Sequence, residues 1–160
     1  QTALKKGRDA KKIGDMKQIA SALAQYSADN RGLYPDALDD LAPSYLGTTT
    51  AMSATASARD KIMYVTYADA SGNIVSYHLG VPLENQNVVL QSDADCTGVG
   101  ASGCANLTTA VFTNLGSTYG GGNPVPGSGA TDFGGAGTQE AAGGTCTNVL
   151  STCIYDIVPQ

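Results

Sequence analysis

A length of 160 residues predicts one domain with a modest core. Hydrophobic residues make up 42% of the chain, which excludes a disordered polymer, and charged residues make up only 14%. The net charge of −5 hides an asymmetry, because seven of the nine Lys and Arg residues lie in residues 1–31 and none follows Lys61. A basic rod joined to an acidic head is the simplest interpretation, and surfaces of opposite sign can steer subunits together.

Residues 3–29 predict a long helix, because apolar side chains recur at steps of three and four. About 27 residues at ~1.5 Å each make a rod of about 40 Å. The side chains expected to pack this helix on the head are Ile13, Met16, Ile19, Leu23 and Tyr26. Because the apolar face begins only at Ile13, we expect the earlier turns to project from the domain. The alternative is a helix that lies wholly on the core.

The projecting turns are expected to carry a basic cluster made of Lys5, Lys6, Arg8, Lys11 and Lys12. Three interpretations stay open for it: a solvated helix face, a patch that meets lipid headgroups, or a donor to acidic heads of neighbouring subunits. Nucleic acid ranks last, because no aromatic residues are interleaved and the sequence pI is about 4.5.

The segment after the helix predicts a turn and a short helix. Asn30-Arg31-Gly32 supplies helix-stop chemistry, and Tyr34-Pro35 follows it. A short helix is expected at 36–42, with Asp36 as its N-cap.

An antiparallel hairpin is expected next, from residues 61–68 and 74–79, because turn residues separate two strand-like runs. Two more strands are expected at Asn87–Gln91 and Cys153–Val158, while 108–112 is ambiguous. Residues 116–144 hold eleven of the 20 glycines and predict a long, irregular surface loop.

Four cysteines lie in the C-terminal half, and no pair has the C-x-x-C spacing of a zinc site. Two local disulfides, Cys96–Cys104 and Cys146–Cys153, are favoured among the three pairings because the segments that they enclose are short and contain Gly, Ser and Thr. Persistent disulfides would indicate the periplasm or the cell exterior.

The end of the long helix carries a more specific pattern. Arg8-Asp9-Ala10-Lys11-Lys12, then Asp15-Met16-Lys17-Gln18-Ile19, then Leu23, Tyr26, Asp29-Asn30, Gly32 and Tyr34-Pro35 stand in order. This segment resembles the second half of the helix and its exit in the type IV pilin-like superfamily, which includes bacterial type IV pilins and type II secretion pseudopilins. The resemblance covers about a sixth of the chain, and the hairpin and C-terminal strand support it only by their order.

The resemblance implies an α+β fold, with the long helix packed on a small antiparallel sheet and a disulfide-closed C-terminal region. Residues 1–30 would be the C-terminal half of the family's helix, and residues 31–160 the globular head. In the family, a hydrophobic half-helix precedes this part, anchors the subunit in the inner membrane and later lines the filament. The expected function is therefore a structural subunit of an extracellular or periplasmic filament, with related subunits and the inner-membrane assembly machinery as partners. The cysteines and the Gly-rich segment depart from major pseudopilins and favour a pilin or minor subunit.

Catalysis finds little support in the sequence. The single histidine, His78, lies in a strand-like run, so we expect a structural role and no enzyme. A calcium ion is the one cofactor that the residues suggest, through oxygen ligands at Glu84, Asn85, Asn87, Asp93 and Asp95. The spacing is not that of an EF-hand, although calcium binding by major pseudopilins favours this site.

A rival function is a secreted or filament-tip adhesin that binds a surface or a carbohydrate. Eight tyrosines and a polar Gly/Thr/Asn loop would suit a sugar platform. The residues encoded before Gln1 would distinguish the two, since a free-standing adhesin would retain no apolar helix.

Overall fold

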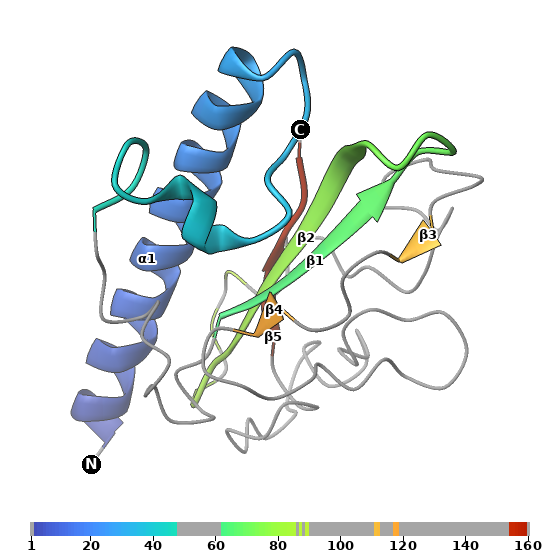
Figure 1. Ribbon diagram of the computed structural model, residues 1–160. Coiled ribbons are helices and arrows are strands. Elements are labelled where there is room, and N and C mark those ends of the chain that lie inside the picture. Colours follow the sequence, from blue (N-terminus) through green and yellow to red (C-terminus); the bar gives the residue numbers. More distant parts are fainter. Residues whose placement is uncertain are drawn as a thin grey trace.

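The computed structural model describes residues 2–47, 62–85, 87, 89, 111–112, 117–118 and 154–159. Within these ranges a long helix lies beside an antiparallel sheet, which confirms the predicted α+β fold (Figure 1). The elements are α1 (Thr2–Asp29), the 3-10 helix η1 (Leu38–Leu41), β1 (Met63–Ala68), β2 (Ile74–Pro82), β3 (Val111–Phe112), β4 (Ser117–Thr118) and β5 (Ile154–Ile157).

The helix α1 ends where the sequence predicts, through a left-handed residue. Arg31 has a φ of 60°, and the amide of Gly32 donates to the carbonyl of Ser27 at 2.8 Å. This is the Schellman arrangement that satisfies the last helical carbonyls. The Asn30 side chain also donates to the Tyr26 carbonyl at 2.8 Å. The chain therefore leaves the helix in a defined direction.

The hairpin of β1 and β2 forms the centre of the sheet, with Tyr64 opposite Leu79 and Thr66 opposite Tyr77. Its turn uses Gly72 at a φ of 83°, a conformation that favours glycine. Strand β5 pairs with β2, whereas β3 and β4 both pair with β1, all antiparallel.

The hairpin turn is fastened by the exposed carboxylate of Asp69. It accepts hydrogen bonds from the amides of Ser71 at 2.8 Å and Asn73 at 2.9 Å, and from the Asn73 side chain at 3.0 Å. These bonds, chiefly that from the Asn73 side chain, lower the pKa of Asp69.

The core lies between α1 and the β1–β2 hairpin. Met16, Ile19 and Leu23 of the helix are buried there, and Ile13 and Tyr26 pack against them. The hairpin, η1 and the neighbouring segments supply the other buried apolar side chains: Leu38, Leu41, Leu46, Ile62, Tyr64, Tyr77, Leu79, Val81, Leu83 and Tyr155. Met16 and Leu23 are 0% exposed, so the apolar stripe of the helix is enclosed by the head.

Three sequence expectations need correction. The short helix is the 3-10 helix η1, and its N-cap is Ala37 in place of Asp36; the Asp40 carboxylate accepts from the Ala37 amide at 3.3 Å. Of Asn87–Gln91, only positions 87 and 89 are described, and neither is in a strand. Ser117–Thr118 forms β4 inside a segment expected to be irregular.

Other predictions fall outside the described ranges, wholly or in part. The cysteines Cys96, Cys104, Cys146 and Cys153 lie there, as do Asp93, Asp95 and the remainder of 116–144. The predicted strand Cys153–Val158 is confirmed over Ile154–Ile157, which form β5.

Candidate functional site

The N-terminal half of α1 is tied to the head by a polar junction, made by Arg8, Asp9 and Lys12 with the segment Pro82–Asn85. The Asp9 carboxylate, in a residue only 1% exposed, accepts from the Glu84 amide at 2.8 Å, the Asn85 amide at 3.0 Å and the Asn85 side chain at 2.8 Å. Arg8 and Glu84 form a two-pronged ion pair with both distances 2.6 Å. The Lys12 ammonium donates to the Pro82 carbonyl at 2.8 Å.

This junction corrects the expectation that all the turns before Ile13 project from the domain. Lys12 is buried and therefore does not belong to the exposed basic cluster, and Arg8 is paired with Glu84. The helix stands clear of the head only over Thr2–Gly7, where every residue is exposed. Lys11 is also exposed and pairs with Asp15 one turn along the helix at 2.7 Å.

The sequence did hold a signal for the junction. Asp9 and Lys12 continue the buried stripe of Met16, Ile19 and Leu23 backwards at alternating steps of three and four. Charged residues are seldom buried unless they have a bonding partner. Two charged residues on the apolar stripe of a helix therefore indicate that the head supplies partners for them.

The calcium prediction shares residues with this junction. Both carboxylate oxygens of Glu84 are held by Arg8, and the Asn85 side chain donates to Asp9. A calcium ion at Glu84 would have to displace the Arg8 guanidinium. Asn87 accepts from the Val89 amide at 3.2 Å. Over the described ranges, no group of three or more His, Cys, Asp or Glu residues gathers in a way that could hold a metal ion.

The other end of α1 leads into an exit segment, residues 30–36, that is fastened to the hairpin. The Tyr34 amide donates to the Ile74 carbonyl at 2.9 Å, and the Tyr64 hydroxyl donates to the Pro35 carbonyl at 2.8 Å. The Tyr34 and Tyr77 rings meet edge-on at 4.9 Å between centroids. The exit from the helix is thus held by backbone and aromatic contacts together.

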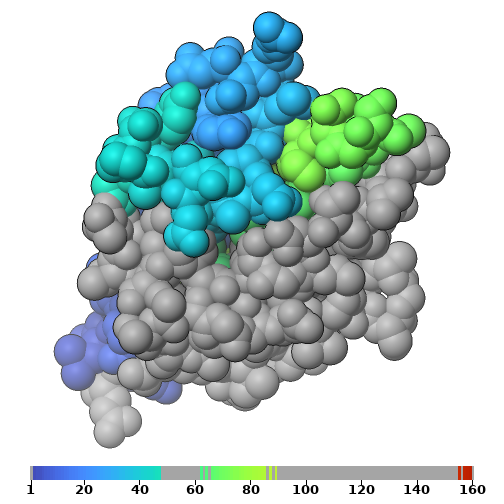
Figure 2. All heavy atoms as spheres, in the orientation of Figure 1, coloured from blue at the N-terminus to red at the C-terminus, as the bar shows by residue number. Residues whose placement is uncertain are grey.

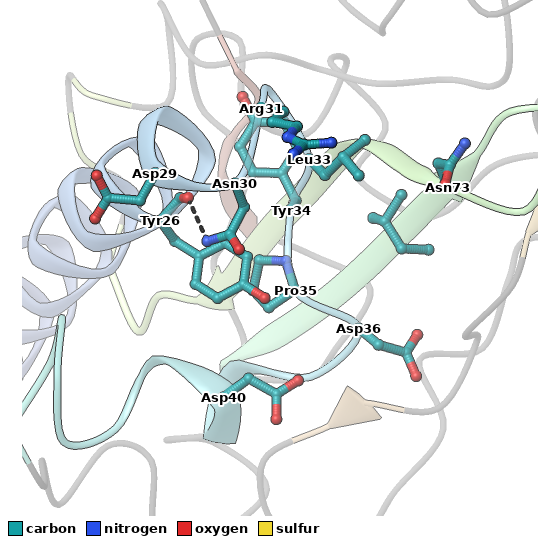
Figure 3. A pocket seen from close by; sticks show the side chains of 11 residues that line it. Tyr26, Asp29, Asn30, Arg31, Leu33, Tyr34, Pro35, Asp36, Asp40 and Asn73 are labelled. Carbon is teal, nitrogen blue, oxygen red and sulfur yellow. Dashed lines mark hydrogen bonds between the residues drawn. The ribbon is translucent and has the colours of Figure 1, made fainter.

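An open hollow, here called the exit hollow, lies beside this segment and has a volume of about 570 Å³ (Figure 3). It is lined by Tyr26, Asp29, Asn30, Arg31, Leu33, Tyr34, Pro35, Asp36, Asp40, Asn73 and Ile74. Figure 3 shows Asp36 and Asp40 on one side of it, while Asp29 points away from the other labelled side chains. The Asp29 carboxylate accepts from the Tyr45 hydroxyl at 3.0 Å, and this bond is the main reason that the pKa of Tyr45 is raised.

The tyrosines under the exit segment predict a fall in stability at high pH. Burial is the main cause that raises the pKa of Tyr64 and of Tyr77. In the unfolded chain these phenols ionise near pH ~10, whereas the folded chain keeps their protons. The unfolded state therefore binds fewer protons above that pH, so stability is complete below about pH 10 and is lost as pH rises.

Urea unfolding between about pH 9 and pH 12 measures this effect. We expect the free energy of unfolding to fall more gently in Tyr77→Phe than in the unaltered chain, because one raised phenol is removed. Equal slopes for the two proteins would contradict the prediction.

His78 lies in β2 and is 0% exposed, on the opposite side of the strand from Leu79. No helix among the residues described here combines the length and apolar character needed to cross a membrane.

The fold defines the class of this chain as an α+β domain with an N-terminal helix packed on a small antiparallel sheet. This arrangement is loosely compatible with the pilin-like fold. No protein-family model, curated protein or solved structure matches the chain.

Proposed function

We propose that this chain is a structural subunit of a type IV pilus-like filament, either a pilin or a pseudopilin, and that it acts by assembly and not by catalysis. The observation that supports this most is the position of α1. The helix is fastened to the head from Arg8 onward, while its first turns, Thr2–Gly7, extend beyond the head. An extended helical rod on a globular head suits stacking in a helical array.

The polar junction fits this function because it fixes the direction of the rod. Asp9, Arg8 and Lys12 hold the helix to one segment of the head with charge-assisted bonds, which are stronger than neutral ones. A filament repeats one subunit contact many times, so a small change in the angle between rod and head would accumulate along it. We propose that the junction keeps this angle constant.

The proposed setting follows from the family resemblance. Before assembly the subunit would be anchored in the inner membrane by an apolar segment preceding Gln1, and afterwards it would lie in a periplasmic or extracellular filament. Its partners would be identical or related subunits and the inner-membrane assembly machinery. The favoured disulfides, Cys96–Cys104 and Cys146–Cys153, belong to the same proposal.

The residues encoded before Gln1 and the mature N-terminus test the proposal. We expect about 20 apolar residues that continue α1 and are retained in the protein purified from cells, as measured by intact-mass spectrometry. A cleaved signal peptide with no retained apolar helix would contradict the filament and favour the secreted adhesin.

A further inference from the structure

Two tyrosine rings meet between the end of α1 and the segment that follows η1. The ring centroids of Tyr26 and Tyr45 are 5.4 Å apart, and the ring planes make an angle of 63°. Both residues are half-buried, so each packs on the protein and also meets solvent. In Figure 2 the last turns of α1, in blue, and the residues around η1, in teal, lie side by side at the surface in the upper part of the molecule.

The described tyrosine contacts under the exit segment are different. The rings of Tyr34 and Tyr64 both contact the ring of Tyr77, at 4.9 Å and 6.0 Å between centroids. Tyr64 is 0% exposed and Tyr77 is 4% exposed, so a reagent in solution cannot reach both members of either pair. Among these described contacts, the pair of Tyr26 and Tyr45 is therefore the one in which solvent reaches both residues.

A carboxylate lies at the hydroxyl of Tyr45. Asp29 is exposed and accepts the hydrogen bond of this hydroxyl at 3.0 Å. A phenol that loses one electron becomes a strong acid, so its proton leaves as well. The carboxylate lies within the distance of about 2.6–3.2 Å at which a side chain accepts a transferred proton. Tyr45 is thus placed to give an electron to an oxidant and its proton to Asp29.

We propose that Tyr26 and Tyr45 form an oxidative cross-linking site, at which hydrogen peroxide, used by a haem peroxidase, joins the two rings through their ortho carbons. Each phenol loses one electron and its hydroxyl proton, Tyr45 to Asp29 and Tyr26 to water. The two radicals couple in one carbon–carbon bond. Each bonded ortho carbon then releases its hydrogen as a proton, and each oxygen regains a proton. The peroxide takes up the two electrons and the two protons that remain and leaves as two water molecules.

The new bond would join the last turns of α1 to the segment after η1. Because the folded chain holds the two rings together before the reaction, coupling within one chain is favoured over coupling between chains. The link removes conformational freedom from the unfolded chain, as a disulfide does, so the linked protein should unfold at a higher urea concentration. This inference does not depend on the proposed filament function.

Peptide mapping after oxidation tests the site. The whole chain, at low concentration, is treated with hydrogen peroxide and a haem peroxidase and is then digested with trypsin, which separates Tyr26 in peptide 18–31 from Tyr45 in peptide 32–59. We expect the two peptides to be joined, with a mass lower than their sum by two hydrogens, in protein that still migrates as a monomer on a denaturing gel. Tyr45→Phe should lose this product. Tyr34→Phe, a change in the same peptide, is the matched control and should keep it.

The carboxylate is tested in the same assay. Asp29→Asn should slow the cross-linking on the order of tenfold or more, because an amide is a much weaker base, whereas Asp15→Asn in the same helix should leave the rate unchanged. In urea that unfolds the chain, the joined peptides should no longer be the main product. An unchanged product in Tyr45→Phe, an unchanged rate in Asp29→Asn, or links that form only between two chains would overturn the proposal.

Discussion

Replacing Leu23 by alanine is expected to lower the free energy of unfolding by roughly 2–5 kcal/mol. Leu23 is 0% exposed and lies in the core between α1 and the hairpin. Truncation removes apolar contacts and leaves a cavity that a small, close-packed core fills only in part. Urea unfolding followed by circular dichroism measures the change.

Leu4→Ala is the matched control, because the same substitution is made in the same helix at a side chain that is 70% exposed. We expect its effect to stay within about 0.5 kcal/mol. Similar losses for the two variants would contradict the view that the helix packs on the head only beyond its first turns.

The second large effect is expected at the polar junction. Asp9→Ala should lower the free energy of unfolding by about 2–5 kcal/mol, since it deprives the amides of Glu84 and Asn85 of their acceptor, at roughly 1–3 kcal/mol for each unsatisfied buried group. Amide hydrogen exchange adds a local measurement. The amides of Glu84 and Asn85 should exchange faster in the variant than in the unaltered chain.

Asp15→Ala is the control for this prediction, because it makes the same change in the same helix. Asp15 forms an ion pair with the exposed Lys11 one turn away in the same helix, and pairs of this kind contribute about 0.3–0.5 kcal/mol. A loss at Asp9 as small as that at Asp15 would show that the junction does not stabilise the helix on the head.

The long helix and the hairpin were predictable because their signals are local. The steps of three and four from Ile13 to Tyr26 mark one helical face, and turn residues separate two strand-like runs. The helix stop at Asn30–Gly32 follows from local chemistry too. The structure adds that Arg31, and not only Gly32, has a positive φ there.

The polar junction was not predictable in the same way. Arg8 and Glu84 are 76 positions apart in the sequence, so only the folded chain brings them together. A charge-rich helix start looks solvated when it is judged by residue type, whereas Lys12 is buried and donates to the Pro82 carbonyl, 70 positions away in the sequence. The oxygen-bearing side chains of Glu84 and Asn85 indicate calcium by residue type, whereas their bonds to Arg8 and Asp9 are seen only in the folded chain.

The exit hollow also depends on tertiary structure. Tyr26 comes from the helix, Pro35 from the exit segment and Ile74 from β2, and no spacing along the sequence relates them. Their joint position follows from the Schellman stop and the Tyr34–Ile74 hydrogen bond, which turn the chain back across the hairpin.

Assembly is the central claim, and immunogold electron microscopy of the producing cells tests it most directly. Antibodies raised against this chain should label filaments continuously along their length, or at sparse points if the chain is a minor subunit. Label that is confined to the medium or spread over the cell surface, with no filament marked, would contradict the account.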